Sequence, residues 1–514
     1  MNVLFISTDM DPWALGLRSI SAVLKKAGHC TQLIFMPTQD KLYSQKNLDD
    51  LISFVRGVDI VGISCLARGS DKAKQIIDSL HPLNKLIVWG GVHASLNPTE
   101  CAEWADIVCR GEGEGMMLEL LERLQNGNPW EDIENAVYKK EGAIITNNPR
   151  PPISDLDTLP LPDFTFEHEY HLISDELIQV STIPEVKQKG NIYFNGSRGC
   201  AFYCTYCCNE KLKNIYAGKN HYVRRMSIPR LIEHAQNLKK IFPHGKYFYF
   251  LDEDFAARPT QELIQFSDEY PQKVGLPFEC LAHPSRINPQ KMDLLTKAGL
   301  WRINMGIESG SERTRKEVYD RHVSNKVVKK AAETISSYPQ VVPYYFMIIA
   351  NPYEEREDLK ETARLISELP YGSHVITYNL VFFPGSALYE RAVQDGLIKG
   401  NEDSGVELDY LTGFKYKQHS WKTKNIYMNG LIFLMAGIST RYRLGIVPRF
   451  MIHALLRPQT IEFHEQHTFN IKTVILAKSL LDSIRHLLAR VAKKFVNNPT
   501  TVYNLGYHLR KAFH

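Results

Sequence analysis

The sequence lacks any run of about 18 uninterrupted apolar residues, the length that a membrane-spanning helix needs. Its first residues, Met1 to Asp9, lack the basic start and the long apolar segment of a secretory signal. The fractions of charged (23%) and hydrophobic (44%) residues depart little from those of ordinary globular chains. We therefore expect a cytoplasmic protein whose 514 residues form several packed domains.

The nine cysteines lack the regular pattern of a disulfide framework, which favours a reducing compartment. Three of them, Cys200, Cys204 and Cys207, fall within eight residues, but no fourth ligand follows at comparable spacing. Cys208 is an unsuitable fourth ligand, because it is adjacent to Cys207 and neighbouring side chains rarely point at one metal. Cys280 is the only cysteine later in the sequence. A structural zinc site would close with a fourth Cys or His. The trio therefore predicts an iron–sulfur cluster site short of one protein ligand, rather than zinc or buried structural thiols.

Residues 1–140 are expected to form a first domain, because short apolar runs of strand type alternate with helical patterns there. The strands are expected at 2–7, 31–36, 58–64, 85–89 and 105–109, and the helices at 17–28, 48–55, 72–80 and 116–125. Such alternation predicts a Rossmann-like, doubly wound parallel sheet that binds ligands at the carboxyl ends of its strands.

Distinctive residues follow the expected strands at this edge. They are Asp11, Trp13 and Gly16 after the first strand, Ser64 and Leu66 after the third, and Gly90, Gly91 and His93 after the fourth. A turn, Arg110-Gly-Glu112-Gly-Glu114, follows the fifth strand. The ordered set resembles the cobalamin-binding domain, whose pattern is Asp-x-His-x-x-Gly, then Ser-x-Leu, then Gly-Gly. The resemblance implies that the residues named after the first, third and fourth strands bind cobalamin.

Trp13 departs from that pattern, because it stands where the family has the His that ligates cobalt. An indole nitrogen is a hydrogen-bond donor only and cannot replace that ligand. If cobalamin binds, the resemblance therefore implies that its lower face has no protein ligand; otherwise the domain holds another ligand or none. His93 is either a cofactor contact or a histidine satisfied within its own loop.

Residues 141–190 are expected to be a stiff connector, since five prolines fall between 147 and 164. Alternation then resumes over 191–400. Strands are expected at 191–195, 247–251, 278–282, 302–307, 344–350 and 375–382, and helices at 227–241, 260–270, 289–298, 323–336 and 355–369. Strand–helix units that begin at the cysteine loop predict a partial (β/α)6 barrel of the TIM type.

The motif Cys-x-x-x-Cys-x-aromatic-Cys, with Tyr206 as the aromatic residue, resembles the radical S-adenosylmethionine superfamily over roughly residues 191 to 400. The resemblance implies a [4Fe–4S] cluster on Cys200, Cys204 and Cys207, with the fourth iron left open for S-adenosylmethionine. It also implies that Tyr206 contacts the adenine and that Asp252 and Glu253 face the methionine ammonium. Glu308, Ser309 and Arg321 would hold the ribose and the carboxylate. Otherwise these are ordinary ion pairs and polar residues at the barrel rim.

Residues 401–514 are expected to be basic and mostly helical, with one long amphipathic helix over 469–496. From residue 421 onward, 14 Lys and Arg stand against 3 Asp and Glu, within a chain of net charge +4. This asymmetry indicates an anionic partner, either a membrane surface contacted peripherally or a phosphorylated ligand. A helical cap over the barrel and a solvated basic face are the alternatives.

A cobalamin-binding domain followed by such a barrel resembles the cobalamin-dependent radical S-adenosylmethionine enzymes. The resemblance implies methylation of an unactivated carbon through a 5′-deoxyadenosyl radical and methylcobalamin. It also implies a small-molecule or lipid-like substrate and an electron donor such as flavodoxin or ferredoxin; no nucleic acid is expected. The alternatives are a cyclase or rearrangement enzyme with the same cofactors, a methylthiotransferase, and a non-catalytic cobalamin or redox sensor.

Overall fold

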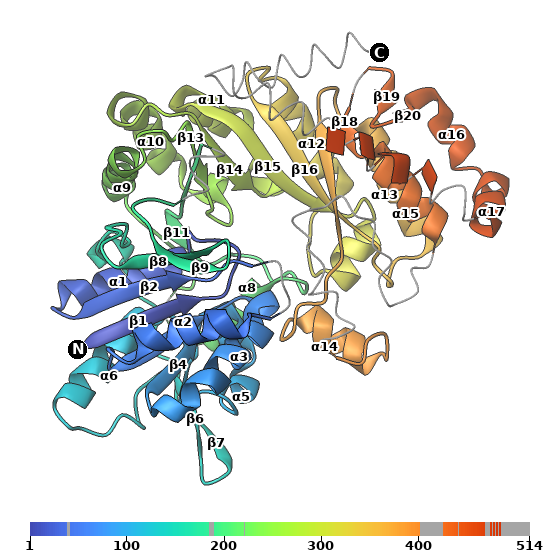
Figure 1. The fold of residues 1–514 in the computed structure, drawn as a ribbon. Coiled ribbons are helices and arrows are strands. Elements are labelled where there is room, and N and C mark those ends of the chain that lie inside the picture. Colours follow the sequence, from blue (N-terminus) through green and yellow to red (C-terminus); the bar gives the residue numbers. More distant parts are fainter. Residues whose placement is uncertain are drawn as a thin grey trace.

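The computed structural model describes residues 1–38, 42–183, 190–219, 221–400, 425–439 and 441–467, with short helical pieces between 473 and 484. Two large sheets organise these residues, and each sheet carries its own helices (Figure 1). The first sheet belongs to the N-terminal part of the chain and the second to its middle. Among these residues, no helix is long and apolar enough to cross a bilayer.

The first sheet has the strand order β7-β6-β5-β4-β3-β1-β2-β8-β9. Its centre consists of parallel strands that match the predicted ones: β1 (Asn2–Ser7), β2 (Cys30–Phe35), β3 (Ile60–Ser64), β4 (Leu86–Gly90) and β5 (Ile107–Cys109). The predicted helices are α1 (Leu15–Lys26), α2 (Gln45–Val55), α3 (Ser70–Leu80) and α6 (Glu114–Gln125).

Side-chain alternation along β1 builds a core on each face of this sheet. Val3 and Phe5 pack with α1 and α6, whereas Leu4 and Ile6 pack with α2 and α3. The predicted doubly wound fold is confirmed. The structure also contains elements that were not predicted. They are the short helices α4 (Gly91–Leu96) and α5 (Pro98–Cys101) and the antiparallel hairpin of β6 (Ala136–Lys140) and β7 (Ala143–Thr146).

The chain after the prolines returns to the first sheet. β8 (Glu169–Ile173) pairs in parallel with β2, and β9 (Glu176–Gln179) pairs with β8. Arg18 of α1 holds this return, because its buried guanidinium donates to the Asp163 carbonyl at 2.7 Å and to both Glu169 carboxylate oxygens at 2.7 and 2.8 Å. No element was predicted here, since the two strands are short and partly polar. The expected domain limits stay a prediction.

The second sheet has the order β10-β13-β14-β15-β16-β17-β18. Its parallel strands are the predicted ones: β10 (Asn191–Phe194), β13 (Tyr247–Phe250), β14 (Phe278–Ala282), β15 (Leu300–Glu308), β16 (Val342–Ile349) and β17 (His374–Asn379). The helices between them are α9 (Ile228–Ile241), α10 (Thr260–Lys273), α11 (Pro289–Ala298), α12 (Asn325–Ser336) and α13 (Arg356–Glu368), and α14 (Ala387–Gln394) follows β17. The partial barrel is confirmed.

The described part of the C-terminal region packs beside this barrel (Figure 1). α15 (Ile426–Met435) is apolar and almost wholly buried, and it lies against α13. β18 (Gly437–Ile438) extends the sheet antiparallel to β17, and α16 (Ile452–Leu455) and α17 (Pro458–Gln466) follow. Most of the long helix predicted over 469–496 lies outside the described residues.

Candidate active site

A cavity of about 390 Å³ lies where the carboxyl ends of the first sheet face the cysteine loop of the barrel. Gly16, Ser64, Gly90 and Gly91 line it from the first domain, together with an apolar slot formed by Phe5, Ile20, Gly62, Val88 and Met117. Asn195, Arg198, Asn209, Tyr216, Tyr222, Arg224 and Glu253 line it from the barrel side. The site therefore lies at the strand ends at which parallel sheets bind ligands.

Two glycines at this edge stand where the protein leaves no space for a side chain. A Cβ atom on Gly91, whose φ is 89°, would lie 2.7 Å from the Ser64 hydroxyl oxygen. A Cβ atom on Gly62 would lie 2.6 Å from the Phe5 ring. A wide, glycine-walled and mostly apolar space fits a bulky cofactor such as cobalamin.

Four of the eight residues predicted to bind cobalamin do not line this cavity. Asp11 is exposed and accepts the Trp13 backbone N–H at 3.0 Å, and Leu66 is also exposed. His93 is buried, with its ring against Trp89, and burial lowers its pKa. Its Nδ1 lies 3.4 Å from the side-chain nitrogen of Asn97, the residue that follows its own helix α4.

Trp13 is the fourth predicted residue that does not line the first cavity. Its side chain is 1% exposed and packs in an aromatic cluster with Phe164 of the connector, Tyr193 of β10 and Phe242 after α9. The ring centroids of these partners lie 5.1 to 5.7 Å from the indole. Trp13 therefore joins the first domain to the barrel and is turned away from the cavity.

The three predicted cluster ligands follow β11 (Ser197–Arg198) and precede α8 (Cys208–Ile215). Arg321 donates to the Cys204 sulfur at 3.6 Å, and the Asn209 amide donates to the Cys207 sulfur at 3.7 Å. Burial raises the pKa of Cys200 to about 12. A hydrogen bond from the Cys208 thiol lowers the pKa of Cys207.

The donor set fits a cubane cluster better than a single metal ion. Within the described ranges, no three His, Cys, Asp or Glu side chains converge on one ion site. Thiolates around a cubane bind separate irons, so their sulfur atoms need not share one centre. Three clustered thiols, with Arg321 and Asn209 donating to two of the sulfurs, therefore match a [4Fe–4S] cluster with one iron left for another ligand.

A second cavity of about 220 Å³ opens inside the barrel, and Tyr206 and Glu308 line it together with Phe346 and Tyr378. Burial raises the pKa of Glu308, against the opposing effects of Arg321 and of a hydrogen bond from Tyr206. Arg321 also donates to the Gly306 carbonyl at 2.7 Å. Tyr206, Glu308 and Arg321, all predicted to bind S-adenosylmethionine, are thus brought together next to Cys204.

The other three predicted residues of this group lie apart. Ser309 is fully buried and donates to Glu354 at 2.7 Å. Asp252 is 1% exposed and accepts the Gly196 N–H at 2.8 Å. Glu253 lines the first cavity, where the surrounding protein raises the pKa of its carboxyl group.

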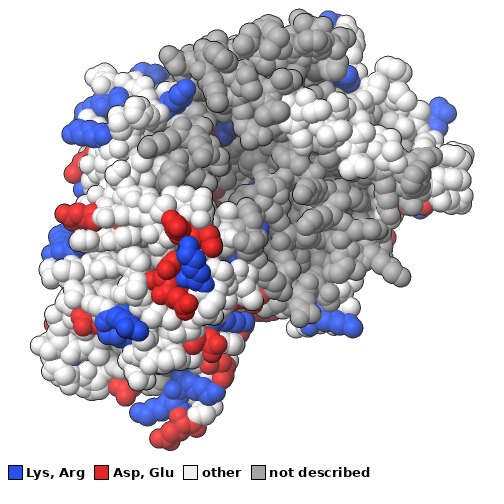
Figure 2. Space-filling view, in the orientation of Figure 1, with Lys and Arg blue, Asp and Glu red and all other residues white. Residues whose placement is uncertain are grey.

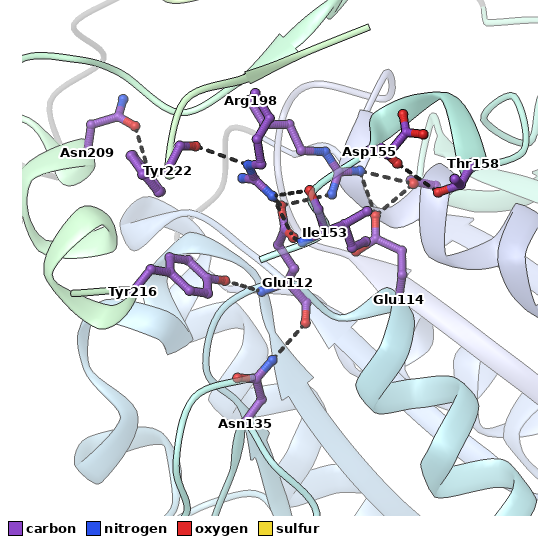
Figure 3. Close-up of polar contacts among 12 residues, drawn as sticks. Glu112, Glu114, Asn135, Ile153, Asp155, Thr158, Arg198, Asn209, Tyr216 and Tyr222 are labelled. Atoms are coloured by element: carbon purple, nitrogen blue, oxygen red, sulfur yellow. Dashed lines mark hydrogen bonds and ion pairs between the residues drawn. The ribbon is translucent and has the colours of Figure 1, made fainter. Parts of the chain in front are cut away.

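The structure adds a polar cluster that the sequence did not assign. Glu112 and Glu114, in the turn after β5, meet Arg198 and Arg224 from the barrel side at the wall of the first cavity (Figure 3). The glycine-rich turn was distinctive in the sequence, but nothing in its pattern indicated its partners. Arg198 lies two residues before Cys200, a position that would have been the only signal.

Residues 1–121 match the family model of the B12 binding domain, and residues 194–366 match that of the Radical SAM superfamily. An uncharacterized methyltransferase of Pyrococcus horikoshii is 25% identical over 75% of this chain and 79% of its own length. Cytidylyl-2-hydroxyethylphosphonate methyltransferase of Streptomyces wedmorensis is 23% identical over 80% and 84%. The anaerobic magnesium-protoporphyrin IX monomethyl ester cyclase of Rubrivivax gelatinosus is 24% identical over 66% of this chain, but over only 59% of its own length.

Solved structures share the fold. The cobalamin-dependent S-adenosylmethionine radical enzyme OxsB superposes with a TM-score of 0.66 at 14% identity, over 99% of this chain and 83% of its own. The radical S-adenosylmethionine methyltransferase TsrM of Kitasatospora setae superposes with a TM-score of 0.62 at 15% identity, over 77% and 76%.

Proposed function

The chain joins a B12-binding domain to a radical SAM domain, and we propose that the pair works as a cobalamin-dependent radical S-adenosylmethionine methyltransferase acting on an unactivated carbon. The observation that carries the proposal is the shared cavity. Its walls combine the strand ends of the first domain with Arg198, Asn209 and Glu253, which flank or face the cysteine loop. Two cofactors bound at these walls would face each other across one shared space, as transfer between them requires.

The residues divide into three groups within this proposal. Cys200, Cys204 and Cys207 hold the cluster, and Tyr206, Glu308, Arg321 and Glu253 bind S-adenosylmethionine. Gly16, Ser64, Gly90 and Gly91 bind the corrinoid. When bound, the cluster supplies an electron to S-adenosylmethionine and the corrinoid supplies a methyl group.

The chain's own side chains position these groups and exclude water. Asp252 and Ser309 support the barrel loops from behind, through Gly196 and Glu354. Arg321 carries a positive charge between Cys204 and the Gly306 carbonyl, where it can pair with the carboxylate of a bound amino acid. An electron donor such as flavodoxin or ferredoxin completes the proposal.

The proposal is tested with chain reconstituted anaerobically with iron, sulfide and hydroxocobalamin, then reduced and given S-adenosylmethionine. We expect about one S-adenosylhomocysteine per bound cobalt as well as 5′-deoxyadenosine. Cobalt-free chain is the control and should give only 5′-deoxyadenosine.

The second candidate is a cyclase with the same cofactors, favoured by the similarity to the Rubrivivax cyclase. Formation of 5′-deoxyadenosine by the cobalt-loaded chain, without any S-adenosylhomocysteine, would contradict methyl transfer and favour the cyclase. Both candidate functions require the same cluster loop, so the ratio of S-adenosylhomocysteine to 5′-deoxyadenosine is what distinguishes them.

We also propose that the C-terminal region contacts an anionic membrane surface. Tyr442 and Phe450 are 73% and 82% exposed, and the Arg449 N–H donates to the Tyr442 carbonyl at 2.8 Å, which holds the two aromatic residues near each other. Arg441 lies over the Tyr442 ring. Both charge signs are interspersed over the first domain in Figure 2, whereas basic residues predominate in the C-terminal sequence. Exposed aromatic side chains among basic ones suit the headgroup region of a bilayer.

A further inference from the structure

Glu112 contacts three separate parts of the chain (Figure 3). Its carboxylate accepts hydrogen bonds from Arg198 at 3.1 Å, from Arg224 at 3.0 Å and from the Ile153 backbone N–H of the connector at 2.8 Å. Its own backbone N–H donates to the Tyr216 hydroxyl oxygen at 2.8 Å. One residue of the first domain thus bonds the connector and both sides of the cysteine loop.

Glu114 strengthens the same contact. It begins α6, is 4% exposed, and accepts from Arg198 at 2.6 Å and from Ser19 at 2.7 Å. Burial alone would raise the pKa of Glu114, but Arg198 and Ser19 hold it below its ordinary value. The carboxylate is therefore charged and directed at the guanidinium of Arg198.

The loop is held at both ends. Arg198 precedes Cys200 by two residues, and Tyr216 caps α8, the helix that follows Cys207. Gly199, which lies between Arg198 and Cys200, has a φ of 86°, and a Cβ atom on it would lie 2.4 Å from the Tyr222 carbonyl oxygen. The direction of the chain from Arg198 into the loop is therefore determined closely.

We propose that Glu112, Glu114, Arg198 and Arg224, here called the interdomain clamp, are positioning residues that set the separation between the cluster and the cofactor of the first domain. The clamp lines the first cavity, between the strand ends of the first domain and the residues that flank the cysteine loop. Arginine suits this role, because its planar fork bonds two carboxylates in a fixed geometry, whereas the ammonium group of lysine is a flexible point charge that fixes no such geometry. This inference rests on the proposed function.

The first test measures a distance. Holoenzyme is reduced so that cob(II)alamin and the cluster are both paramagnetic, and pulsed electron paramagnetic resonance gives the distribution of their separation. We expect one narrow distribution for the unaltered chain, a broad one for Glu114→Gln and Arg198→Met, and an intermediate one for Arg198→Lys. Glu103→Gln is the matched control, since Glu103 pairs with Lys139 on the surface of the same domain.

An unchanged distribution in Glu114→Gln, with both cofactors retained, would overturn the clamp. A second measurement does not depend on cofactors: hydrogen–deuterium exchange of the full chains without them. The clamp predicts about tenfold faster exchange in residues 150–158 and 196–219 of Glu114→Gln, with the β14 and β15 core unchanged. Equal exchange in Glu114→Gln and Glu103→Gln would contradict it. If the unaltered chain binds neither cobalt nor a cluster, the proposed function is contradicted but the clamp is not. The exchange data would still test whether the clamp holds the two segments in place.

Discussion

The Trp13 indole lies 5.1 Å, centroid to centroid, from the ring of Phe242. Trp13 follows the first strand of the first domain, whereas Phe242 follows α9 of the barrel. The position that carries the cobalt-ligating His in the cobalamin-binding pattern is therefore part of an aromatic contact between domains. A corrinoid in the cavity would receive no protein ligand from this side chain.

Restoring the histidine should not restore the ligand. In Trp13→His the imidazole would lie among Phe164, Tyr193 and Phe242, where it has no path to the cavity. The smaller, polar ring should lower the free energy of unfolding by about 3 kcal/mol. Electron paramagnetic resonance of the cob(II)alamin-loaded variant should show no nitrogen ligand on cobalt. Trp104→His, at a partly exposed tryptophan, is the control, and a nitrogen signal confined to Trp13→His would contradict this account.

Gly111 should tolerate no side chain. Its φ is 112°, and a Cβ atom would lie 2.4 Å from the Tyr216 hydroxyl oxygen. Gly111→Ala should therefore lower the free energy of unfolding by about 2 kcal/mol. Tyr216→Phe removes the nearest atom, so the double variant should recover part of the loss in thermal unfolding. Gly299→Ala, with φ 107° and its nearest atom 3.8 Å away, measures the strain of a similar backbone conformation without the clash, and an equal loss there would contradict the steric clash.

Glu354 should make stability depend on pH. Burial raises its pKa from 4.5 to about 7, so the folded chain keeps this proton where the unfolded chain has lost it. Stability from this group is present below pH 4.5 and is lost as the pH rises through 7. Glu354→Gln should remove this slope and be more stable by roughly 3 kcal/mol above pH 7. The control is Glu357→Gln at an exposed ion pair, and parallel pH profiles for the unaltered chain and Glu354→Gln would refute the assignment.

The membrane contact predicts binding that depends on both charge and aromatic side chains. The intact chain should sediment with phosphatidylglycerol vesicles and remain in solution with phosphatidylcholine vesicles. A Tyr442→Ser, Phe450→Ser double variant should lose most of the bound fraction. Ser replacement of Tyr203, an exposed aromatic residue in the cysteine loop, should leave that fraction unchanged. An intact chain that ignores both vesicles would end this proposal.

The central parallel strands of both sheets and the long helices between them could be predicted because their signal is local. The apolar run Val3 to Ile6 is too short for a helix and therefore favours a buried strand, and its side chains pack alternately on the two faces of the sheet. The spacing of Cys200, Cys204 and Cys207 is an equally local signal, because the three cysteines fall within eight residues. The return of the connector could not be predicted, since it depends on Arg18 and Glu169, which lie 151 residues apart. The clamp joins Glu114 to Arg198 over 84 residues in the same way.

The different positions of adjacent residues were also hard to predict from the sequence. Glu308 and Ser309 were expected to act together, but β15 ends at Glu308, whose φ of 70° turns the chain between the two residues. Glu308 accordingly faces the barrel cavity, while Ser309 bonds Glu354 behind it. Asp252 and Glu253 divide likewise, the first beneath the loop and the second at the cavity.

In the proposed function, one chain holds an iron–sulfur cluster and a corrinoid across a shared cavity. Metal analysis of the anaerobically reconstituted chain tests it most directly. We predict about four iron and about one cobalt per chain, with iron lost in Cys207→Ala and kept in Cys280→Ala, whose cysteine is buried in β14. A chain that binds iron equally well in both variants, or that takes up no cobalt, would contradict the account.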